Sequence, residues 1–380
     1  MKNNVYDLIK YQCVGCGSCE AICPKSCINL KEKKNIGILP FVNNNECINC
    51  GVCIDVCPTL MLEKKEDLNK IKTIFIGKST DDEIIKNSSS GGIVSSIIID
   101  RFDKQEIDAA LVAFYDDNLN IYGDIITSKK EVLNHSGSFY HTSKLLKNIK
   151  KIKNYNSVLL VGLPCQNVAF ELYAEKYQIK NIYGRISLFC TIGRMKNGFI
   201  EYLKENNFSL DPDNIVIKYK SRYGVDRLGP IIIETSKGES INFDCGDYLQ
   251  SKDYFYIPNG CLYCRKLFGV DFADISVGDD WGINTKQKTA IFTVNSNKGM
   301  EIIENNNLIY REISNMSKLK KSQPIGFALK YSKKTKVIYE LKILKFFYRV
   351  LPKNSFFKKV LFKIRTLILR QIQRIESEKF

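Results

Sequence analysis

Residues 13–24 read CVGCGSCEAICP, and residues 47–58 repeat the pattern as CINCGVCIDVCP. Both copies have the form C-x2-C-G-x-C-x3-C-P. A cubane [4Fe-4S] cluster needs four thiolates around one small site, and three closely spaced cysteines supply three of them. In this spacing the fourth cysteine of each copy, which precedes a proline, binds the cluster of the other copy. The repeat therefore predicts two [4Fe-4S] clusters in one small domain.

The crossed pattern divides the eight cysteines into two ligand sets, namely Cys13, Cys16, Cys19 and Cys57, and Cys47, Cys50, Cys53 and Cys23. Gly17 and Gly51 let backbone amides approach the cluster sulfides without a side chain in the way. A pair of zinc sites is the alternative, but zinc binds a self-contained set of four ligands and leaves the two Cys-Pro positions unexplained. Residues 1–62 therefore resemble a bacterial two-cluster ferredoxin domain. Cys27 lies outside the repeat, and we expect it to be a small buried core residue.

Composition and charge limit the remaining possibilities. The 380 residues are 44% hydrophobic and 26% charged, which is enough to build cores for two or three domains. The net charge is +16, but residues 311–380 hold 19 basic and 4 acidic residues, so residues 1–310 are almost neutral. A neutral body argues against a nucleic-acid groove. Residues 1–11 have no apolar signal segment and no run of 18 apolar residues occurs, so we expect a cytoplasmic protein with reduced thiols.

The rest of the chain predicts an α+β fold. Apolar runs typical of strands cover residues 71–76, 109–115, 158–162, 182–189, 215–219 and 231–234, and helical patterns cover residues 93–102 and 167–177. No strand-linked G-x-G-x-x-G and no complete phosphate-binding loop occurs, which excludes the usual nicotinamide- and nucleoside-triphosphate-binding folds. We expect a small ferredoxin domain, an α/β body with a mixed sheet, and a basic helical C-terminal tail.

Four segments of the body have residues typical of a ligand site. Residues 88–92 read SSSGG before a helix, where backbone amides suit a phosphate, although a plain flexible linker would have the same composition. Residues 136–143 form a hydroxyl-rich loop. Residues 162–166 follow a strand directly, at the position where α/β sheets bind ligands. Cys261 and Cys264 form a C-x2-C pair that precedes the sequence ADISVGDDWG at residues 273–282.

In this order, the four segments resemble the beta subunit of coenzyme F420 hydrogenase/dehydrogenase over roughly residues 70–300. The resemblance implies a flavoprotein-like body in two parts, residues 70–155 and 156–310, that follows the ferredoxin module. Members of the family reduce F420, serve as subunits of formate dehydrogenases and sulfite reductases, or reduce a chlorophyll derivative in plants. Similar bacterial chains are typical of surface-polysaccharide gene clusters.

The resemblance also implies a bound flavin, FAD or FMN, with F420 as a second candidate. The implied cofactor-binding residues are Ser90, Gly91, Gly92, Ser138, Tyr140, Ser143, Gly162, Pro164, Gln166 and Asp279. Phe139 stands where the family usually has a lysine, and Thr191 follows Cys190 where the family usually has a histidine. These departures argue against F420 more than against flavin. Asp279 and Trp281 have an alternative role as residues that stabilise the fold.

Four cysteines outside the repeat predict a third [4Fe-4S] cluster. They are Cys165, Cys190, Cys261 and Cys264. Cys165 and Cys190 each follow an apolar strand, and the C-x2-C pair completes the set. The alternative is that these are scattered structural thiols. Cys245 is left unassigned and is a substitute candidate for a ligand.

The C-terminal tail has the pattern of an amphipathic basic helix. Apolar residues recur at helical spacing at Phe356, Phe357, Val360, Leu361, Ile364, Leu367, Ile368, Ile372 and Ile375, with lysines and arginines between them. Such a helix binds an anionic membrane surface, where each basic residue contributes roughly 1 kcal/mol. We expect peripheral contact with the inner face of the membrane; the alternative is a helix packed on the body or on a partner.

These features predict an oxidoreductase. Electrons from an external low-potential donor would pass through the clusters to the flavin, which converts single electrons into a hydride equivalent for the substrate. The substrate is not identified by the sequence, although the resemblance points to surface-polysaccharide biosynthesis. The alternatives are a non-catalytic electron-transfer subunit of a larger complex and, more remotely, a nucleic-acid-binding iron–sulfur protein.

Overall fold

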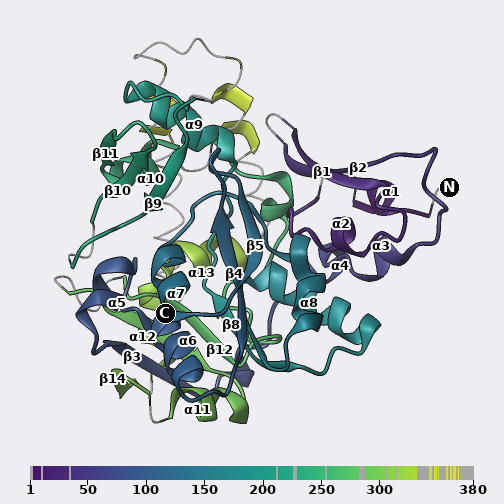
Figure 1. Cartoon of the computed structure of the whole chain (residues 1–380). Helices are drawn as coiled ribbons and strands as arrows, with labels where there is room; N and C mark the ends of the chain where they lie inside the picture. Colours follow the sequence, from purple (N-terminus) through teal and green to yellow (C-terminus); the bar gives the residue numbers. More distant parts are fainter. Residues whose placement is uncertain are drawn as a thin grey trace.

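The computed structural model contains an N-terminal ferredoxin domain, a large mixed sheet with helices, and a smaller three-stranded sheet (Figure 1). It describes residues 3–9, 12–33, 36–210, 213–225, 229–252, 255–281, 287–304, 306–313 and 315–331, together with scattered residues between 342 and 367. The basic helix predicted between Phe356 and Ile375 lies outside the described residues, apart from isolated positions such as Leu361.

The ferredoxin domain consists of short helices and one β-hairpin. Its elements are α1 (Val5–Ile9), α2 (Ser18–Ile22), β1 (Ile28–Lys33), β2 (Gly37–Val42), α3 (Val52–Asp55) and α4 (Thr59–Leu62). Helices α2 and α3 begin at equivalent points of the repeat, each after a glycine with positive φ, 95° at Gly17 and 76° at Gly51. A side chain would be strained there. A Cβ at Gly17 would also lie 2.8 Å from the backbone nitrogen of Lys147, so this glycine lets the ferredoxin domain contact the body.

The large sheet has nine strands in the order β14-β3-β13-β12-β8-β7-β4-β5-β6. Strands β12, β8, β7 and β4 run parallel, and antiparallel pairs extend the sheet on both sides. The strands are β3 (Thr73–Ser79), β4 (Ala109–Tyr115), β5 (Ile121–Ile126), β6 (Ser143–Lys144), β7 (Val158–Gly162), β8 (Ile182–Leu188), β12 (Ile275–Asp279), β13 (Ala290–Val294) and β14 (Leu308–Glu312).

Helices cover both faces of this sheet. They are α5 (Asp82–Asn87), α6 (Ile93–Asp103), α7 (Lys129–His135), α8 (Pro164–Tyr177) and α11 (Asn297–Ile303), with the 3-10 helices η1 (Leu68–Lys70) and η2 (Leu145–Asn154). Alternate residues of β7 enter different cores, as the period of a strand requires. Leu159 and Val161 pack with side chains of α6, whereas Val158 and Leu160 pack with α8 and with the ferredoxin domain. The ferredoxin domain, seen beside α8 in Figure 1, therefore shares one hydrophobic core with the sheet.

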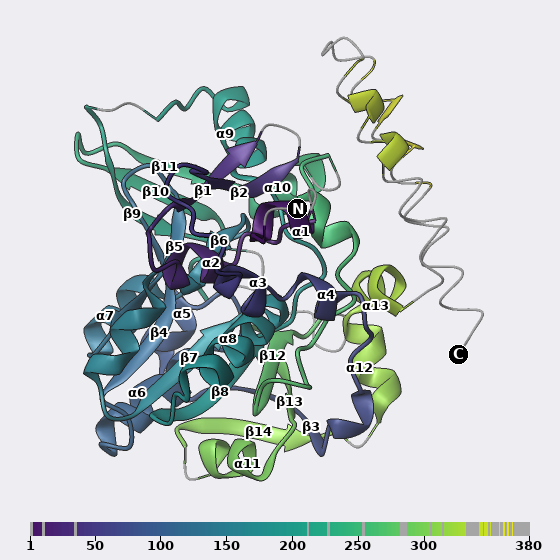
Figure 2. The ribbon, with the colours of Figure 1, turned by 90° about the vertical axis from the view of Figure 1, so that its right-hand side faces the viewer.

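The smaller sheet is antiparallel and has its own aromatic core. It contains β9 (Val216–Lys220), β10 (Ile231–Thr235) and β11 (Ser240–Phe243), and packs with α9 (Lys196–Glu205) and α10 (Cys245–Lys252). Cys245 is fully buried in this core. The chain then forms η3 (Asn259–Leu262) and, after β14, the helices α12 (Met316–Ser322) and α13 (Pro324–Tyr331), which follow one another beside the large sheet in Figure 2.

The α+β fold expected from the sequence is confirmed, with shifts of a few residues at element ends. The predicted helix at residues 167–177 begins earlier, at Pro164, because Pro suits the first turn of a helix and the Gln166 carboxamide oxygen accepts a hydrogen bond from Leu163 N. Within the part of the chain that the structure describes, no helix is both long and apolar enough to cross a bilayer.

Glu66 connects the ferredoxin domain to the body through one buried carboxylate. Its oxygens accept hydrogen bonds from four consecutive backbone N–H groups, those of Leu267 at 2.8 Å, Phe268 at 2.9 Å, Gly269 at 2.6 Å and Val270 at 3.3 Å. The Tyr331 hydroxyl of α13 donates a further bond to the same carboxylate. The side chain is therefore a junction for three segments that are far apart in sequence.

Replacing Glu66 is expected to destabilise this junction. Glu66→Ala leaves several buried N–H groups without an acceptor and should lower the free energy of unfolding by about 3 kcal/mol. Glu66→Gln keeps one acceptor oxygen, so its free energy of unfolding should lie between those of the unmodified protein and of Glu66→Ala. Thermal unfolding followed by circular dichroism under anaerobic conditions measures the effect. The matched control is Glu63→Ala at an exposed position of the same segment. Equal midpoints for the two alanine variants would contradict this role.

Candidate functional site

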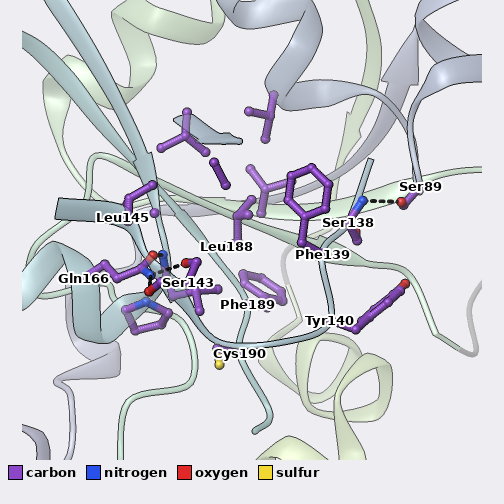
Figure 3. A pocket seen from close by; sticks show the side chains of 18 of the residues that line it. Ser89, Ser138, Phe139, Tyr140, Ser143, Leu145, Gln166, Leu188, Phe189 and Cys190 are labelled. Carbon is purple, nitrogen blue, oxygen red and sulfur yellow. Dashed lines mark hydrogen bonds between the residues drawn. The ribbon is translucent and has the colours of Figure 1, made fainter. Parts of the chain in front are cut away.

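A cavity of about 440 Å³ opens where β7, β8 and β12 end. Gly162, Leu188 and Asp279, at the carboxyl ends of these three strands, all line it. Parallel strands commonly present ligand-binding groups at this edge of a sheet, and the volume lies in the range of small-molecule pockets. Figure 3 shows this cavity with side chains from several separate segments around it.

The cavity brings together the loops singled out from the sequence. Of the predicted cofactor-binding residues, those that line it are Ser90, Gly92, Ser138, Tyr140, Ser143, Gly162, Pro164, Gln166 and Asp279. Gly91 is not among the lining residues. A Cβ at Gly91 would lie 2.6 Å from the carbonyl oxygen of Gly77 and 2.7 Å from the nitrogen of Ala290. Gly91 therefore lets the loop pass close to the backbone of β3 and β13.

Hydrogen bonds between loops fix the shape of one wall of the cavity. Ser89 Oγ accepts from Ser138 N at 2.8 Å, as Figure 3 shows, and donates to Ser221 O at 2.9 Å. Ser90 Oγ donates to Thr289 O at 2.8 Å. These hydroxyls hold the loops together. Gly92, with φ 72°, begins α6 without any side-chain hydrogen bond to its first turn.

Gln166 and Ser143 form a second connection on the other wall. Gln166 Nε2 donates to Ser143 Oγ at 2.7 Å, while Gln166 Oε1 accepts from Leu163 N at 2.8 Å. One carboxamide thus joins the turn between β7 and α8 to the hydroxyl-rich loop at residues 136–143. Both side chains are largely buried, and both face the cavity in Figure 3.

Arg222 is a residue of this region that sequence reasoning missed. Its guanidinium makes two hydrogen bonds of 2.7 Å with the Asp279 carboxylate and a further bond with Ser89 O, and it lies 5.4 Å from the Trp281 ring centre. Burial opposes its charge, while the Asp279 carboxylate and the neighbouring Tyr140 raise the pKa of Arg222 above its ordinary value. No local pattern around Arg222 indicates this pairing, which depends on the contact of the smaller sheet with β12.

Burial removes the charge from both histidines near the cavity. It lowers the pKa of His135 and of His141 to about 4, so both imidazoles are neutral at pH 7. His141 Nε2 lies 2.6 Å from Leu119 O, and its ring stacks on Phe199. Phe139, at the position where the family usually has a lysine, packs against the rings of Tyr115 and Tyr219.

The four cysteines predicted to form a third ligand set line the same cavity, and they are Cys165, Cys190, Cys261 and Cys264. Cys165 is at the start of α8, Cys190 follows β8, and the other two lie in and just after η3. Burial and then the charges of the other three thiols raise the pKa of Cys165 well above its ordinary value, and the pKa of Cys261 is raised to about 12. A bound metal centre would compensate the charge of such thiols in the thiolate form. Cys245 lies apart from them in the core of the smaller sheet.

The crossed assignment of the ferredoxin cysteines stays a prediction, and the structure brings the cysteines of one of its two sets together. Cys13, Cys16, Cys19 and Cys57 all line one small cavity. In the other set, Cys53 lies near Cys23 and Cys50, whose charges raise its pKa, although burial is the larger cause. Cys27 is buried, as expected, with its sulfur 3.4 Å from that of Cys23. Among the described residues, no three His, Cys, Asp or Glu side chains are placed to hold a single metal ion.

Electrostatic interactions connect the three cysteine sets. Cys53 of one ferredoxin set is close enough for its charge to raise the pKa of Cys19 of the other. The charge of Cys16 likewise raises the pKa of Cys165, and the charge of Cys261 raises the pKa of Cys13. Burial is the largest cause of the raised pKa in each case. The first ferredoxin set, Cys13, Cys16, Cys19 and Cys57, is therefore near both the second set, Cys47, Cys50, Cys53 and Cys23, and the cysteines of the cavity.

The repeat and the fold that it forms define an iron–sulfur protein with a ferredoxin domain attached to an α/β body. Residues 12–61 match the family model described as a 4Fe-4S dicluster domain. Residues 74–150 and 155–318 match the N-terminal and C-terminal models of the coenzyme F420 hydrogenase/dehydrogenase beta subunit. The chain belongs to this family.

Two similar proteins are named as subunits of F420-linked enzymes. The chain is 25% identical over 287 residues to a subunit of F420H2 dehydrogenase from Methanosarcina mazei, covering 73% of this chain and 78% of that protein. It is 33% identical over 219 residues to the beta subunit of coenzyme F420 hydrogenase from Methanococcus voltae, covering 54% of this chain and 72% of the relative.

A solved structure shares the fold. It is described as a xenon derivative of the F420-reducing [NiFe] hydrogenase complex from Methanosarcina barkeri, and one of its chains superposes with a TM-score of 0.52 at 20% identity. The match covers 70% of this chain and 93% of that chain.

The Arg222–Asp279 pair is expected to contribute strongly to stability. Asp279→Asn leaves the buried Arg222 charge uncompensated and should lower the free energy of unfolding by about 3 kcal/mol. Arg222→Met should cost less, because the carboxylate that it leaves unpaired is partly exposed. The double variant should regain part of this loss, because no unpaired charge remains. Thermal unfolding of the four proteins measures the coupling. Lys218→Met, in the half-exposed pair with Glu234, is the control and should cost below about 1 kcal/mol. Strictly additive losses in the double variant would disprove the coupling.

Proposed function

We propose that the chain is an iron–sulfur flavoprotein oxidoreductase. It takes electrons from an external low-potential donor and passes them through three [4Fe-4S] clusters to a flavin in the cavity, which reduces a substrate. The observation that carries the proposal is that four cysteines from outside the ferredoxin repeat line the same cavity as the predicted cofactor loops.

The residues of the cavity fit a flavin. Apolar side chains such as Ile98, Leu145 and Leu188 suit a flat isoalloxazine ring, and the start of α6 at Gly92 has no side-chain cap to compete with a phosphate group. Ser88 Oγ is buried there without a hydrogen-bond partner among the described residues. The proposed FAD is held by the predicted residues that line the cavity, while Gly91 supports the loop from behind. A bound flavin supplies the exchange between one-electron and two-electron chemistry.

The order of the cysteine sets supports a single electron path. Cys50, in the second ferredoxin set, is exposed, so the proposed donor delivers electrons at this cluster. The set of Cys13, Cys16, Cys19 and Cys57 comes next, and the cavity cysteines follow. The protein positions each centre and excludes water from the buried ones.

The substrate is a separate part of the proposal. The relatives are named for F420, but Phe139 here packs into an aromatic cluster and the two histidines are neutral. We therefore propose a substrate other than F420. On the family resemblance described above, we propose that this substrate belongs to surface-polysaccharide biosynthesis. When F420 is mixed with the isolated protein under reducing conditions, the absorbance of F420 should not change. Rapid reduction of F420 by the protein would overturn this part of the proposal.

A second candidate function is an electron-transfer subunit of a larger redox complex, linked to F420, formate or hydrogen. The observation that favours it is that the similar structure comes from a multi-subunit hydrogenase complex. A complex subunit would be isolated from its host with stoichiometric partner chains. The oxidoreductase proposed above would be isolated alone and would carry out turnover with an artificial electron donor.

Metal and flavin analysis tests the proposed cofactors. The full chain, purified without oxygen, should contain about twelve irons and twelve sulfides, four per cubane, and one flavin. Cys165→Ser should remove about four irons and leave the ferredoxin clusters intact. Cys245→Ser, at a buried cysteine outside the three sets, is the control and should keep all the iron. Only about eight irons in the unmodified protein would rule out the third cluster.

We also propose that the tail contacts a membrane surface. Phe346 is 57% exposed and Leu367 59% exposed, whereas Leu344 and Tyr348 are buried in one cluster with Phe255. The segment thus presents apolar side chains to solvent within a strongly basic part of the chain.

Removal of the residues after Leu351 should abolish co-sedimentation with vesicles that contain anionic lipid. In the full chain, binding should weaken as salt rises, because exposed charges are screened over about 8 Å at physiological ionic strength. Iron and flavin contents should not change. If the shortened protein still co-sediments, or if it loses its cofactors, the tail is a structural element packed on the body and the proposed membrane contact is wrong.

A further inference from the structure

Lys330 lies beside the cavity cysteines although it comes from beyond the matched family domain. The family model ends at residue 318, and Lys330 is in α13, near its end. It nevertheless lines the cavity together with Cys165, Cys190, Cys261 and Cys264. Helix α13 is therefore part of the site.

The position of Lys330 is fixed by its surroundings. The Arg265 side chain donates to Lys330 O at 3.1 Å, and the neighbouring Tyr331 hydroxyl bonds to Glu66. On the buried face of α13, Phe327 packs against Phe268 with ring centres 5.5 Å apart. The backbone that carries the ammonium group is thus held by contacts with the segment that follows Cys264.

The ammonium group is buried without a carboxylate partner. Lys330 is 2% exposed, and Nζ donates to the carbonyl oxygen of Cys264 at 3.1 Å. Among the residues that the structure describes, no carboxylate lies within ion-pair distance of this nitrogen. By contrast Lys266, which also lines the cavity, pairs with Asp271 at 3.0 Å. A buried charge without a counter-charge is very costly, so an anionic group is needed near Lys330.

The cysteine set supplies that negative charge. Cys165, Cys190, Cys261 and Cys264 line the cavity beside Lys330, and Lys330 Nζ lies 3.1 Å from the backbone oxygen of Cys264. A buried ammonium group and buried thiolates are each costly alone, because their charges are not compensated. Placed together, the opposite charges compensate one another. With four thiolates, a cubane cluster remains anionic, and its reduction adds one electron and one further negative charge without breaking a bond.

We propose that Lys330 is the counter-charge of the third cluster: a positioning residue whose ammonium group stabilises the reduced state and raises the reduction potential of that cluster. This inference rests on the proposed third cluster. It assigns a function to α13 and explains why a lysine is tolerated in a fully buried position. Charge and hydrogen bonding near the sulfurs are known determinants of cluster potential.

Three variants separate the charge of Lys330 from its hydrogen bond. Lys330→Met removes both, Lys330→Gln keeps a donor for Cys264 O, and Lys330→Arg keeps the charge. Lys321→Met, at an exposed position of α12, is the matched control for the loss of one lysine charge. The readout is a potentiometric titration of the full holoprotein followed by electron paramagnetic resonance, in which the third cluster is the signal lost in Cys165→Ser.

Loss of the charge should make reduction of the third cluster at least tenfold less favourable in Lys330→Met and in Lys330→Gln, a fall of about 59 mV for one electron. Lys330→Arg and Lys321→Met should remain close to the unmodified protein. Loss of this cluster in the Met and Gln variants, with retention in Arg, would support the same role. A Gln variant with unchanged iron content and potential would overturn the inference while the third cluster stands. An unmodified protein without the third signal would instead refute the proposed function.

Discussion

Backbone hydrogen bonds between the ferredoxin domain and the body are the constraint on which the rest of the structure depends. Leu146 N donates to Cys16 O at 2.8 Å, Arg265 N to Leu62 O at 2.7 Å, and Asn259 N to Ile36 O at 2.7 Å. Cys16 belongs to the ferredoxin repeat, and Asn259 and Arg265 flank the pair of Cys261 and Cys264 in the body. Since electron transfer between buried centres requires short distances, a shift of the ferredoxin domain would interrupt the proposed path. The shared core below the large sheet and the Glu66 junction maintain the same contact.

Charge in the interior is organised around the cavity. Arg222 is compensated by Asp279, and Lys330 lies beside the four cavity cysteines, with no carboxylate within ion-pair distance among the described residues. The neutral histidines add no charge at pH 7. A cation without a carboxylate partner favours a neighbouring group that gains negative charge on reduction, because it stabilises the added electron in a medium of low dielectric constant. In the proposal above, Lys330 therefore links the packing of α13 to the redox chemistry of the cavity.

Local sequence patterns predict only part of this account. The cysteine repeat is dense enough to predict the ferredoxin domain and its glycines. Hydroxyl-rich composition predicts the loop around Ser138, and a strand-end position predicts the loop around Gly162. Glu66, Arg222 and Lys330 have no such local signal, because each acts on groups at least 57 residues away along the chain. The glycine-rich loop predicts Gly91 at the cofactor, yet its neighbours are the backbones of β3 and β13. Composition identifies a glycine-rich loop but does not reveal which glycine lines the cavity and which lies against the sheet.

Rapid-mixing kinetics of flavin reduction test the central claim, that the cavity cysteines connect the ferredoxin clusters to the flavin. The unmodified protein and Cys165→Ser, each with flavin bound, are mixed without oxygen with a low-potential one-electron donor. Bleaching of the clusters and of the flavin is then followed separately. The ferredoxin clusters should be reduced at the same rate in both proteins. Flavin reduction should be much slower in Cys165→Ser than in the unmodified protein. Equal rates of flavin reduction in the two proteins would contradict it.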